Sequence, residues 1–244
     1  MPFRIATEPG RPDRPNEDFA AVSADCAVLL DGVTARPDDG CRHGVAWFTR
    51  SLGGLLLAGA DAGLDLREAL AEAIGGVASL HGGTCDLARR QTPSATVVAV
   101  RVRGAALEYL VLSDAVLLVR GQDGARLIAD TRLDDLRGRV AGPVRAYRNV
   151  PGGFWTAGAD PRAADEAVAG TLPHGPFAAL TDGAGRGVEV FRAHGWGEAL
   201  DLALEQGPGA LVARVRALER ADPEGARHPR GKVHDDATVV TWTP

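Results

Sequence analysis

Cysteine is scarce in this chain, and its placement excludes one class of protein. The three cysteines among 244 residues, Cys26, Cys41 and Cys85, are odd in number and follow no CxxC spacing. Such thiols argue against a disulfide-stapled secreted fold and favour a reducing cytoplasm, where we expect them to pack as small apolar groups. No apolar run approaches the ~20 residues of a membrane span, and no signal-peptide pattern opens the sequence. We therefore expect a cytoplasmic protein that does not associate with a membrane.

Lysine is almost absent, and the overall charge excludes a second class. Lys232 is the only lysine, and the formal net charge is −5. A chain with this charge has no basic footprint for nucleic acid, so we exclude nucleic-acid partners. With 45% hydrophobic residues, the chain is long enough to bury one substantial core. Neither an internal repeat nor a long linker interrupts it, and we expect a single domain over residues 1–244.

Hydrophobic patterning predicts an α+β protein. Apolar residues at helical spacing predict helices over residues 41–58, 65–80, 187–194, 196–205 and 210–220. Short β-rich runs predict strands over residues 3–7, 18–23, 26–31, 94–102, 106–112, 115–120, 125–129, 153–156, 167–172, 177–181 and 237–242. The four strands between 94 and 129 follow one another across short turns, so we expect an antiparallel meander. The charged segment 130–152 is expected to be an irregular surface segment or flap. Paired helices next to strands indicate helical layers packed on sheets.

Acidic residues stand where strands begin and end. Glu17 and Asp18 precede one predicted strand, and the apolar run 27–30 ends on Asp31-Gly32. A hairpin between these strands brings the three acids together from opposite ends of one loop. Like charges repel in one site unless a cation joins them, and carboxylate oxygens suit Mg²⁺ or Mn²⁺. An Asp-Gly pair by itself most often marks an ordinary turn.

The pattern recurs twice, and this recurrence favours the metal interpretation. The apolar run 177–180 leads through Thr181 to Asp182-Gly183, which repeats a strand that ends in Asp-Gly. Near the C-terminus, Asp235 and Asp236 lie at the start of the β-rich run 237–242. Acids at three strand ends, far apart in sequence, predict a bridged metal centre.

The order of these motifs resembles the metal-dependent phosphatases of the PP2C (PPM) family. The shared motifs are NED at 16–18, DG at 31–32, SATVV at 94–98, LSDA at 112–115, TDG at 181–183 and DDATVV at 235–240. The resemblance runs from about residue 10 to residue 242. It implies a four-layer α-β-β-α sandwich, in which two mainly antiparallel sheets lie between helical layers.

The resemblance also implies two Mn²⁺ or Mg²⁺ ions held by the strand-end acids. Asp31 would bridge the two ions, and the carbonyl of Gly32 would help to hold one of them. The remaining roles would fall to Asp182 and Asp235 at the first ion, to Glu17 at the second, and to Asp18 as a residue that ligates or orients a metal-bound water.

Two further acids differ from these ligands. Asp236 occupies a position where the family motif often has asparagine, so we expect it to be a structural partner of Asp235. Asp114 stands in LSDA where family members carry GDS, and it either holds an additional, weaker ion or is a simple turn aspartate. The family often has another acid four residues after the TDG aspartate. That position is Arg186 here, which counts against an additional ion.

The phosphate-binding arginine of the family is displaced in this sequence. The family places an arginine four residues before the glutamate of NED, and this position is Asp13 here, with Arg11 and Arg14 on either side. Arginine forks onto phosphate oxygens, and we expect Arg14, the nearer of the two, to bind phosphate, with Arg11 as the second candidate. The alternative is that both are solvated loop arginines.

The histidine that is a candidate general acid in many family members is also absent from its usual position. Many family members carry a histidine directly after the DG pair, but this position is Val33 here. We predict instead that His43, near the start of the next helix, binds phosphate or protonates the leaving group, because helix N-termini attract anions and histidine titrates near neutral pH. Asp38 or Asp39 is expected to cap that helix. The alternative is a helix histidine paired with a local carboxylate.

The implied function is hydrolysis of phosphoserine or phosphothreonine in proteins through a metal-activated water, without a covalent phospho-enzyme. The partner would be a phosphoprotein that a Ser/Thr kinase has modified. Two alternatives remain open. One is a regulatory or binding protein of the same fold that has lost turnover, and the other is a phosphatase for small phosphoesters, which would use the same site residues.

Overall fold

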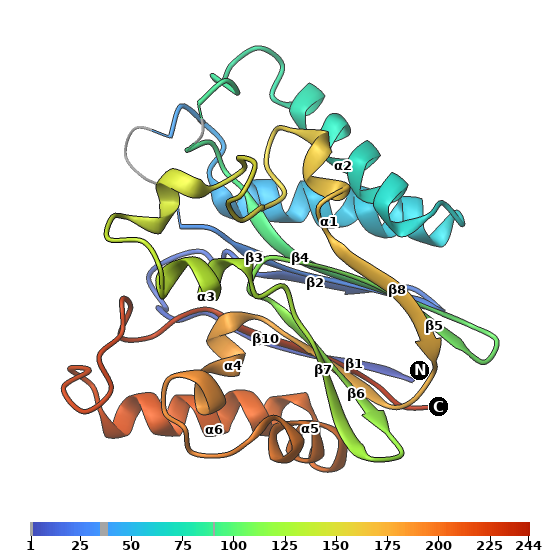
Figure 1. Cartoon of the computed structure of the whole chain (residues 1–244), viewed down its shortest axis with the longest axis vertical. Helices are drawn as coiled ribbons and strands as arrows, with labels where there is room; N and C mark the ends of the chain where they lie inside the picture. The colour runs from blue at the N-terminus through green and yellow to red at the C-terminus, as the bar shows by residue number, and fades with distance from the viewer. Residues whose placement is uncertain (1, 35–38, 90) are drawn as a thin grey trace.

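Two five-stranded antiparallel sheets pack face to face in the structure, a computed structural model that describes residues 2–34, 39–89 and 91–244 (Figure 1). The first sheet has the order β1 (Phe3–Glu8), β10 (Ala237–Trp242), β9 (Phe177–Leu180), β6 (Val116–Gly121) and β7 (Gly124–Ile128). The second has the order β2 (Phe19–Val22), β3 (Cys26–Gly32), β4 (Ala95–Arg103), β5 (Ala106–Leu112) and β8 (Val168–Pro173).

Helices cover the outer face of each sheet. The helices α1 (Val45–Asp61) and α2 (Leu66–Leu80) pack on the second sheet, and α4 (Asp182–Glu189), α5 (Trp196–Glu205) and α6 (Pro208–Ala221) pack on the first (Figure 1). The predicted four-layer α-β-β-α sandwich is therefore confirmed. Among the described residues, we find no helix with the length and apolar character needed to cross a membrane.

Successive side chains of a strand alternate between two apolar layers, one under the helices and one between the sheets. In β3, Val28 and Leu30 pack toward α1 and α2, whereas Ala27 and Leu29 join the apolar layer between the sheets. Successive strand side chains point to opposite faces, so the sequence of a strand that is buried on both faces is a continuous apolar run. This burial fixes the register of β3 and, with it, the position of Asp31 at its end.

The predicted meander between residues 94 and 129 is wrong in one respect. The strands β4 and β5 form a hairpin in the second sheet, but β6 and β7 form theirs in the first. The chain changes sheets at the turn after Leu112, where Ser113 has a φ of 67°. Turn residues and the alternation of apolar and polar residues predict where a strand ends, but they do not show which sheet the next strand joins. The crossing places Asp114 between the two sheets.

Several helix boundaries also differ from the prediction. The first helix begins at Val45 instead of residue 41, after Gly44, whose φ is 81°. The helix predicted over 187–194 is wrong, because α4 spans Asp182–Glu189 and starts on the TDG motif itself. Its glycine-rich sequence has low helix propensity, and packing against β10 and α6 outweighs that propensity.

The segment 130–152 is partly ordered, and residues 153–156 form no strand. The helix α3 (Arg132–Arg137) and the 3₁₀ turn Val144–Tyr147 lie in the predicted flap, and Phe154 makes only an isolated bridge to Arg148. Gly44 precedes α1 without any side-chain cap, and Asp39 accepts a hydrogen bond from the Cys41 N–H. Asp38, the other predicted cap, lies outside the described residues.

Candidate metal centre

Four segments that are distant in sequence meet at one edge of the two sheets. They are the loop before β2, the end of β3, the start of α4 and the loop before β10, and two glycines allow them to approach. A Cβ at Gly32 would lie 2.7 Å from the Glu17 carbonyl oxygen and 2.3 Å from Val45 Cγ1. A Cβ at Gly183 would lie 1.9 Å from the Asp236 carbonyl oxygen. The second residue of each Asp-Gly pair therefore leaves room for a neighbouring chain segment.

Asp31 and Asp182 are brought together at the centre of this edge. Their carboxyl groups are within hydrogen-bonding reach, and among the described residues neither forms an ion pair with an arginine or lysine. Burial raises the pKa of Asp31 well above its usual value, and the neighbouring charges of Asp182 and Asp18 raise it further. Such a pair of carboxylates is stabilised by a cation between them.

Asp18 lies near this pair and is a buried acid with one oxygen that accepts no hydrogen bond from the described residues. Its Oδ2 accepts hydrogen bonds from the hydroxyls of Thr181 (3.0 Å) and Thr238 (2.7 Å). Its Oδ1 is buried and has no hydrogen-bond partner among the described residues. Burial raises the pKa of Asp18 to about 8. An unsatisfied buried carboxylate oxygen is costly, and the oxygen is available to a cation or a water.

Two more acids extend the cluster toward α3. Burial and the charge of Asp182 raise the pKa of Asp114 to about 6. Burial and the charges of Asp134, Asp182 and Asp114 raise the pKa of Glu189 to about 7. The charges of Asp114 and Asp182 therefore act on each other, and Arg137 lies 3.8 Å from Asp114. Glu189 was not predicted from the sequence.

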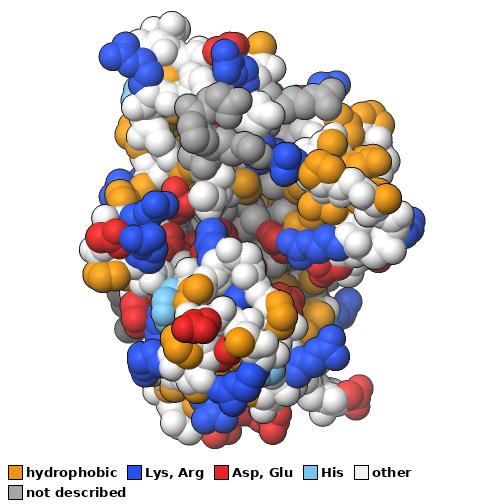
Figure 2. Space-filling model, turned by 90° about the vertical axis from the view of Figure 1, so that its left-hand side faces the viewer, with side chains coloured by type: hydrophobic (Ala, Val, Ile, Leu, Met, Phe, Trp, Pro, Cys, Tyr) orange, Lys and Arg blue, Asp and Glu red, His pale blue; other side chains and the backbone are white. Residues whose placement is uncertain are grey.

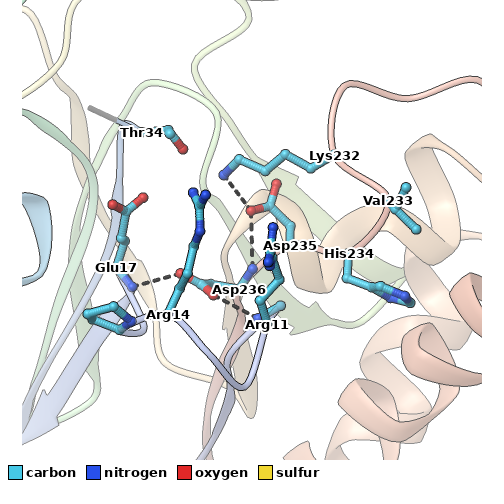
Figure 3. A pocket seen from close by; sticks show the side chains of 11 residues that line it. Arg11, Arg14, Glu17, Thr34, Lys232, Val233, His234, Asp235 and Asp236 are labelled. Atoms are coloured by element: carbon cyan, nitrogen blue, oxygen red, sulfur yellow. Dashed lines mark hydrogen bonds and ion pairs between the residues drawn. The ribbon is translucent and has the colours of Figure 1, made fainter. Parts of the chain in front are cut away.

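The negative charge of Asp235 is balanced by two basic side chains. Asp235 Oδ1 accepts a 2.6 Å hydrogen bond from Lys232 Nζ (Figure 3). Its Oδ2 accepts a 2.9 Å hydrogen bond from Arg186. Arg186 is buried and also pairs with Glu219, at 2.7 Å. The position where the family often has an acid thus holds a fixed positive charge. Lys232, the single lysine of the chain, is a site residue that the sequence analysis missed.

Asp236 holds the N-terminal loop in place. Its Oδ1 accepts the backbone N–H of Gly10 and its Oδ2 accepts that of Glu17, both at 2.7 Å. Both carboxylate oxygens are therefore used by backbone donors, which agrees with a structural role. Asp235 lies at the rim of the cavity with Glu17, whose pKa is raised by burial.

These contacts predict different results for asparagine at the two positions. Asp235→Asn should remove most metal-dependent activity of the site, because an amide is a poor ligand and leaves Lys232 and Arg186 without their acid. Asp236→Asn keeps one acceptor oxygen and leaves one buried N–H unpaired, at a cost of about 1–2 kcal/mol. It should lower Tm by about 2–8 °C and keep most of the turnover. Steady-state kinetics and thermal unfolding of both variants test this, and the reverse ranking would contradict the assignment.

A cavity of about 500 Å³ opens beside the acids. Arg14 lines it and lies between Glu17 and Asp235, and its guanidinium has no ion-pair partner among the described residues (Figure 3). Arg11 also lines the cavity, but its guanidinium binds Asp13 at 2.6 Å. Figure 2 views the molecule from the side on which these loops lie, and acidic and basic side chains flank a hollow between its upper and lower halves.

His43 has different neighbours from those predicted. It is exposed, it does not line the cavity, and it lies before α1. Its ring stacks on Trp47, with centroids 4.2 Å apart, and its Nδ1 lies 3.4 Å from Cys85 Sγ. The structure therefore does not bring His43 to the acids, and we no longer assign it to phosphate binding or proton transfer. Helical spacing placed it in the first helical turn, but the helix starts two residues later.

The donor set fits Mn²⁺ or Mg²⁺. The converging side chains are carboxylates, Asp18 Oδ1 is unsatisfied, and Asp31 and Asp182 form no ion pair with an arginine or lysine among the described residues. Hard divalent cations prefer such ligands. The fit is weaker at Asp235, where Lys232 and Arg186 already occupy both oxygens.

Comparison with known proteins relates the fold to one group of enzymes. No protein-family model and no curated protein sequence matches the chain. PppA, a regulatory component of the type VI secretion system in Pseudomonas aeruginosa, is a structural neighbour with a TM-score of 0.65 and 19% identity, over 100% of this chain and 98% of PppA. The PPM Ser-Thr phosphatase MsPP from Mycobacterium smegmatis, in complex with cacodylate, is another structural neighbour. Its TM-score is 0.63 and its sequence identity is 19%, over 99% of this chain and 97% of MsPP.

A third structural neighbour contains metal ions. The catalytic domain of the serine/threonine phosphatase PstP, in complex with two manganese ions, gives a TM-score of 0.61 with 15% identity, over 98% of this chain and 96% of that domain. At these identities the likeness concerns the fold, and it covers nearly the whole chain. The chain therefore has the fold of the PP2C (PPM) Ser/Thr phosphatases, with an acidic cluster where its two sheets meet.

Proposed function

We propose that this chain is a Mn²⁺- or Mg²⁺-dependent phosphatase that hydrolyses phosphoserine or phosphothreonine in proteins. One observation carries the proposal: acids from four separate segments converge, and the central pair, Asp31 and Asp182, forms no ion pair with an arginine or lysine among the described residues, although the charge of Lys232 acts on both. A fold that gathers like charges in this way is stabilised when cations bind.

The residues divide into metal-holding and phosphate-binding groups. Asp31 would bridge two ions, with Glu17 and the Gly32 carbonyl on one side and Asp182 and Asp235 on the other. When bound, the ions supply a water of lowered pKa and neutralise charge on the phosphoryl oxygens. Asp18 Oδ1, which has no partner among the described residues, would accept a hydrogen bond from a water and orient it.

The substrate phosphate would enter past Arg14 and Lys232. Arg14 is exposed on the cavity rim, where a phosphorylated side chain on another protein can reach it. Lys232 Nζ is 2.6 Å from Asp235, so it adds positive charge beside the metal ligands. The proposed partner is therefore a phosphoprotein modified by a Ser/Thr kinase, and the proposed location is the cytoplasm.

The decisive experiment is phosphate release from phosphothreonine peptides with and without Mn²⁺, compared with release from p-nitrophenyl phosphate. We expect Mn²⁺-dependent release from the peptides, and its loss in excess chelator. Full activity in excess chelator would contradict the metal-dependent mechanism. Activity on the aryl phosphate but not on peptides would favour the small-phosphoester alternative.

Arg14 and Arg11 form a matched pair for the phosphate-binding assignment. Arg14→Ala should lower kcat/KM for phosphopeptides by about 10- to 100-fold, because a hydrogen bond to a charged group contributes about 1.5–3 kcal/mol. Arg11→Ala should change it by less than about threefold, because Asp13 already binds that guanidinium and exposed pairs contribute little. The opposite ranking would exchange the two roles.

The regulatory alternative keeps one observation in its favour. Arg186 and Lys232 neutralise Asp235, and two fixed cations at a metal ligand oppose binding of the first ion. A chain without turnover that still binds phosphopeptides would fit this arrangement. Isothermal titration with a phosphothreonine peptide, together with the release assay, separates a binding protein from an enzyme.

A further inference from the structure

Two cysteines and two histidines converge at a second place, on the helical layer that covers the second sheet. Cys41 and His43 lie just before α1, and His81 and Cys85 lie at and after the C-terminal end of α2. One ligand atom from each of the four lies within 4.8 Å of the other three. These ends of α1 and α2 lie at the same side of the upper layer in Figure 1. None of the four residues lines the cavity beside the acids.

The distances in the cluster match those around a tetrahedral metal ion. The two sulfur atoms are 3.7 Å apart, and His43 Nδ1 lies 3.4 Å from Cys85 Sγ and 3.9 Å from Cys41 Sγ. Around a zinc ion with Zn–S of about 2.3 Å and Zn–N of about 2.0 Å, sulfur atoms would be about 3.8 Å apart and sulfur and nitrogen about 3.5 Å apart. A disulfide would need about 2.0 Å between the sulfurs, and both cysteines are free thiols.

His81 provides an independent observation that points to a ligand. Its side chain is buried, at 3% exposure, and its Nδ1 is 2.8 Å from the Val77 carbonyl oxygen. That contact places the proton on Nδ1 and leaves the lone pair on Nε2. Nε2 is buried and has no hydrogen-bond partner among the described residues. A histidine whose other nitrogen donates to a backbone carbonyl is the usual arrangement of a metal ligand.

Backbone N–H groups donate hydrogen bonds to both sulfurs. The N–H of Arg42 donates to Cys85 Sγ at 3.3 Å, and the N–H of His43 donates to Cys41 Sγ at 3.4 Å. The Asp86 N–H also donates to the Gly40 carbonyl oxygen at 3.0 Å, which joins the two segments directly. Donors to sulfur favour the charged form that binds metal.

From this geometry we propose that Cys41, His43, His81 and Cys85 bind one zinc ion in a closed structural site, separate from the acidic centre. Two thiolates and two neutral imidazoles balance the ion's charge, and four protein ligands leave no open position for substrate. Thiolate and imidazole ligands select zinc, whereas the oxygen ligands of the acidic centre suit Mn²⁺ or Mg²⁺. The zinc ion fastens the segment before α1 to the end of α2.

Metal analysis of the whole protein, purified in reducing buffer, tests the proposal. We expect one zinc ion per chain in the wild type and in Asp31→Asn, which alters only the acidic centre. Cys41→Ser combined with Cys85→Ser should lose zinc, and Cys26→Ala should retain it, because Cys26 is buried at the far end of β3. Each single ligand variant should weaken zinc binding by more than about 100-fold, since even partners outside the ligand set change metal affinity by 10- to 100-fold.

Two further measurements keep the test independent of folding defects. His43→Gln replaces an exposed side chain, so the variant should fold, and it should still weaken zinc binding. Cobalt bound in place of zinc should give intense thiolate-to-cobalt absorption in the wild type and in Asp31→Asn, and none in the variant that combines Cys41→Ser with Cys85→Ser. A zinc chelator should lower Tm of the wild type and leave Tm of the double cysteine variant unchanged.

Three results would overturn the proposal. The first is a folded, reduced wild type that binds no zinc from micromolar solution. The second is equal zinc content in the wild type and the double cysteine variant, which would assign the metal to the acidic centre. The third is a Cys41–Cys85 disulfide that persists in reducing buffer.

Discussion

Asp31→Asn is expected to lower kcat for phosphopeptide hydrolysis by about 1,000-fold or more. Asp31 lies in the acidic cluster beside Asp182 and Asp18, and under the proposed function its carboxylate would help to hold both ions. Loss of the bridge removes several kcal/mol of charge stabilisation from the transition state, and each 1.4 kcal/mol corresponds to a tenfold change in rate. The measurement is steady-state kinetics at saturating Mn²⁺.

The control for this prediction is the stability of the metal-free protein. Asparagine removes one of several like charges that burial already disfavours, so metal-free Asp31→Asn should be at least as resistant to heat as the metal-free wild type. Manganese should raise Tm of the wild type more than that of the variant, because ligands that bind only the folded state stabilise it. Turnover above a tenth of the wild-type value would show that Asp31 does not bridge the ions.

Gly183→Ala is expected to cause the largest loss of stability among single methyl additions at the site. The new Cβ would lie 1.9 Å from the Asp236 carbonyl oxygen, which belongs to backbone and cannot rotate away. Overpacking of this kind costs about 1–3 kcal/mol and occasionally more. We expect a fall in Tm of about 6–12 °C, for a cost of about 3 kcal/mol in a chain of this size. Turnover should fall as well, because Asp182 and Asp235 move apart.

Gly75→Ala in α2 is the matched control. A Cβ at Gly75 meets no other atom within 4 Å, and its backbone is helical. Alanine is favoured over glycine in a helix interior by about 1 kcal/mol, so this variant should be as stable as the wild type or more stable. Equal effects of the two substitutions would show that the Gly183 contact does not limit the approach of the two loops.

Most acids of the site were predictable from the sequence because they follow or precede a strong strand signal, whereas Glu189, at the end of α4, was not. The apolar runs before Asp31 and Asp182 are buried on both faces, and this burial fixes the register that places each carboxylate at a strand end. Short motifs in a fixed order then predicted the four-layer sandwich, which the structure confirms. The motif also predicted that Asp236 is a structural partner, which agrees with its two backbone hydrogen bonds, while the ligand role of Asp235 stays a prediction.

What only the tertiary structure decided is which charges and thiols meet. Arg186 reaches Asp235 from α4, whose position depends on packing, and no local pattern encodes that contact, whereas Lys232 pairs with Asp235 from three residues earlier in the same loop. Cys41-x-His43 and His81-x₃-Cys85 are separated by two helices, and only the antiparallel packing of α1 on α2 brings their ends together. Sequence patterns determine local periodicity and strand ends, whereas contacts between distant loops depend on how whole layers pack.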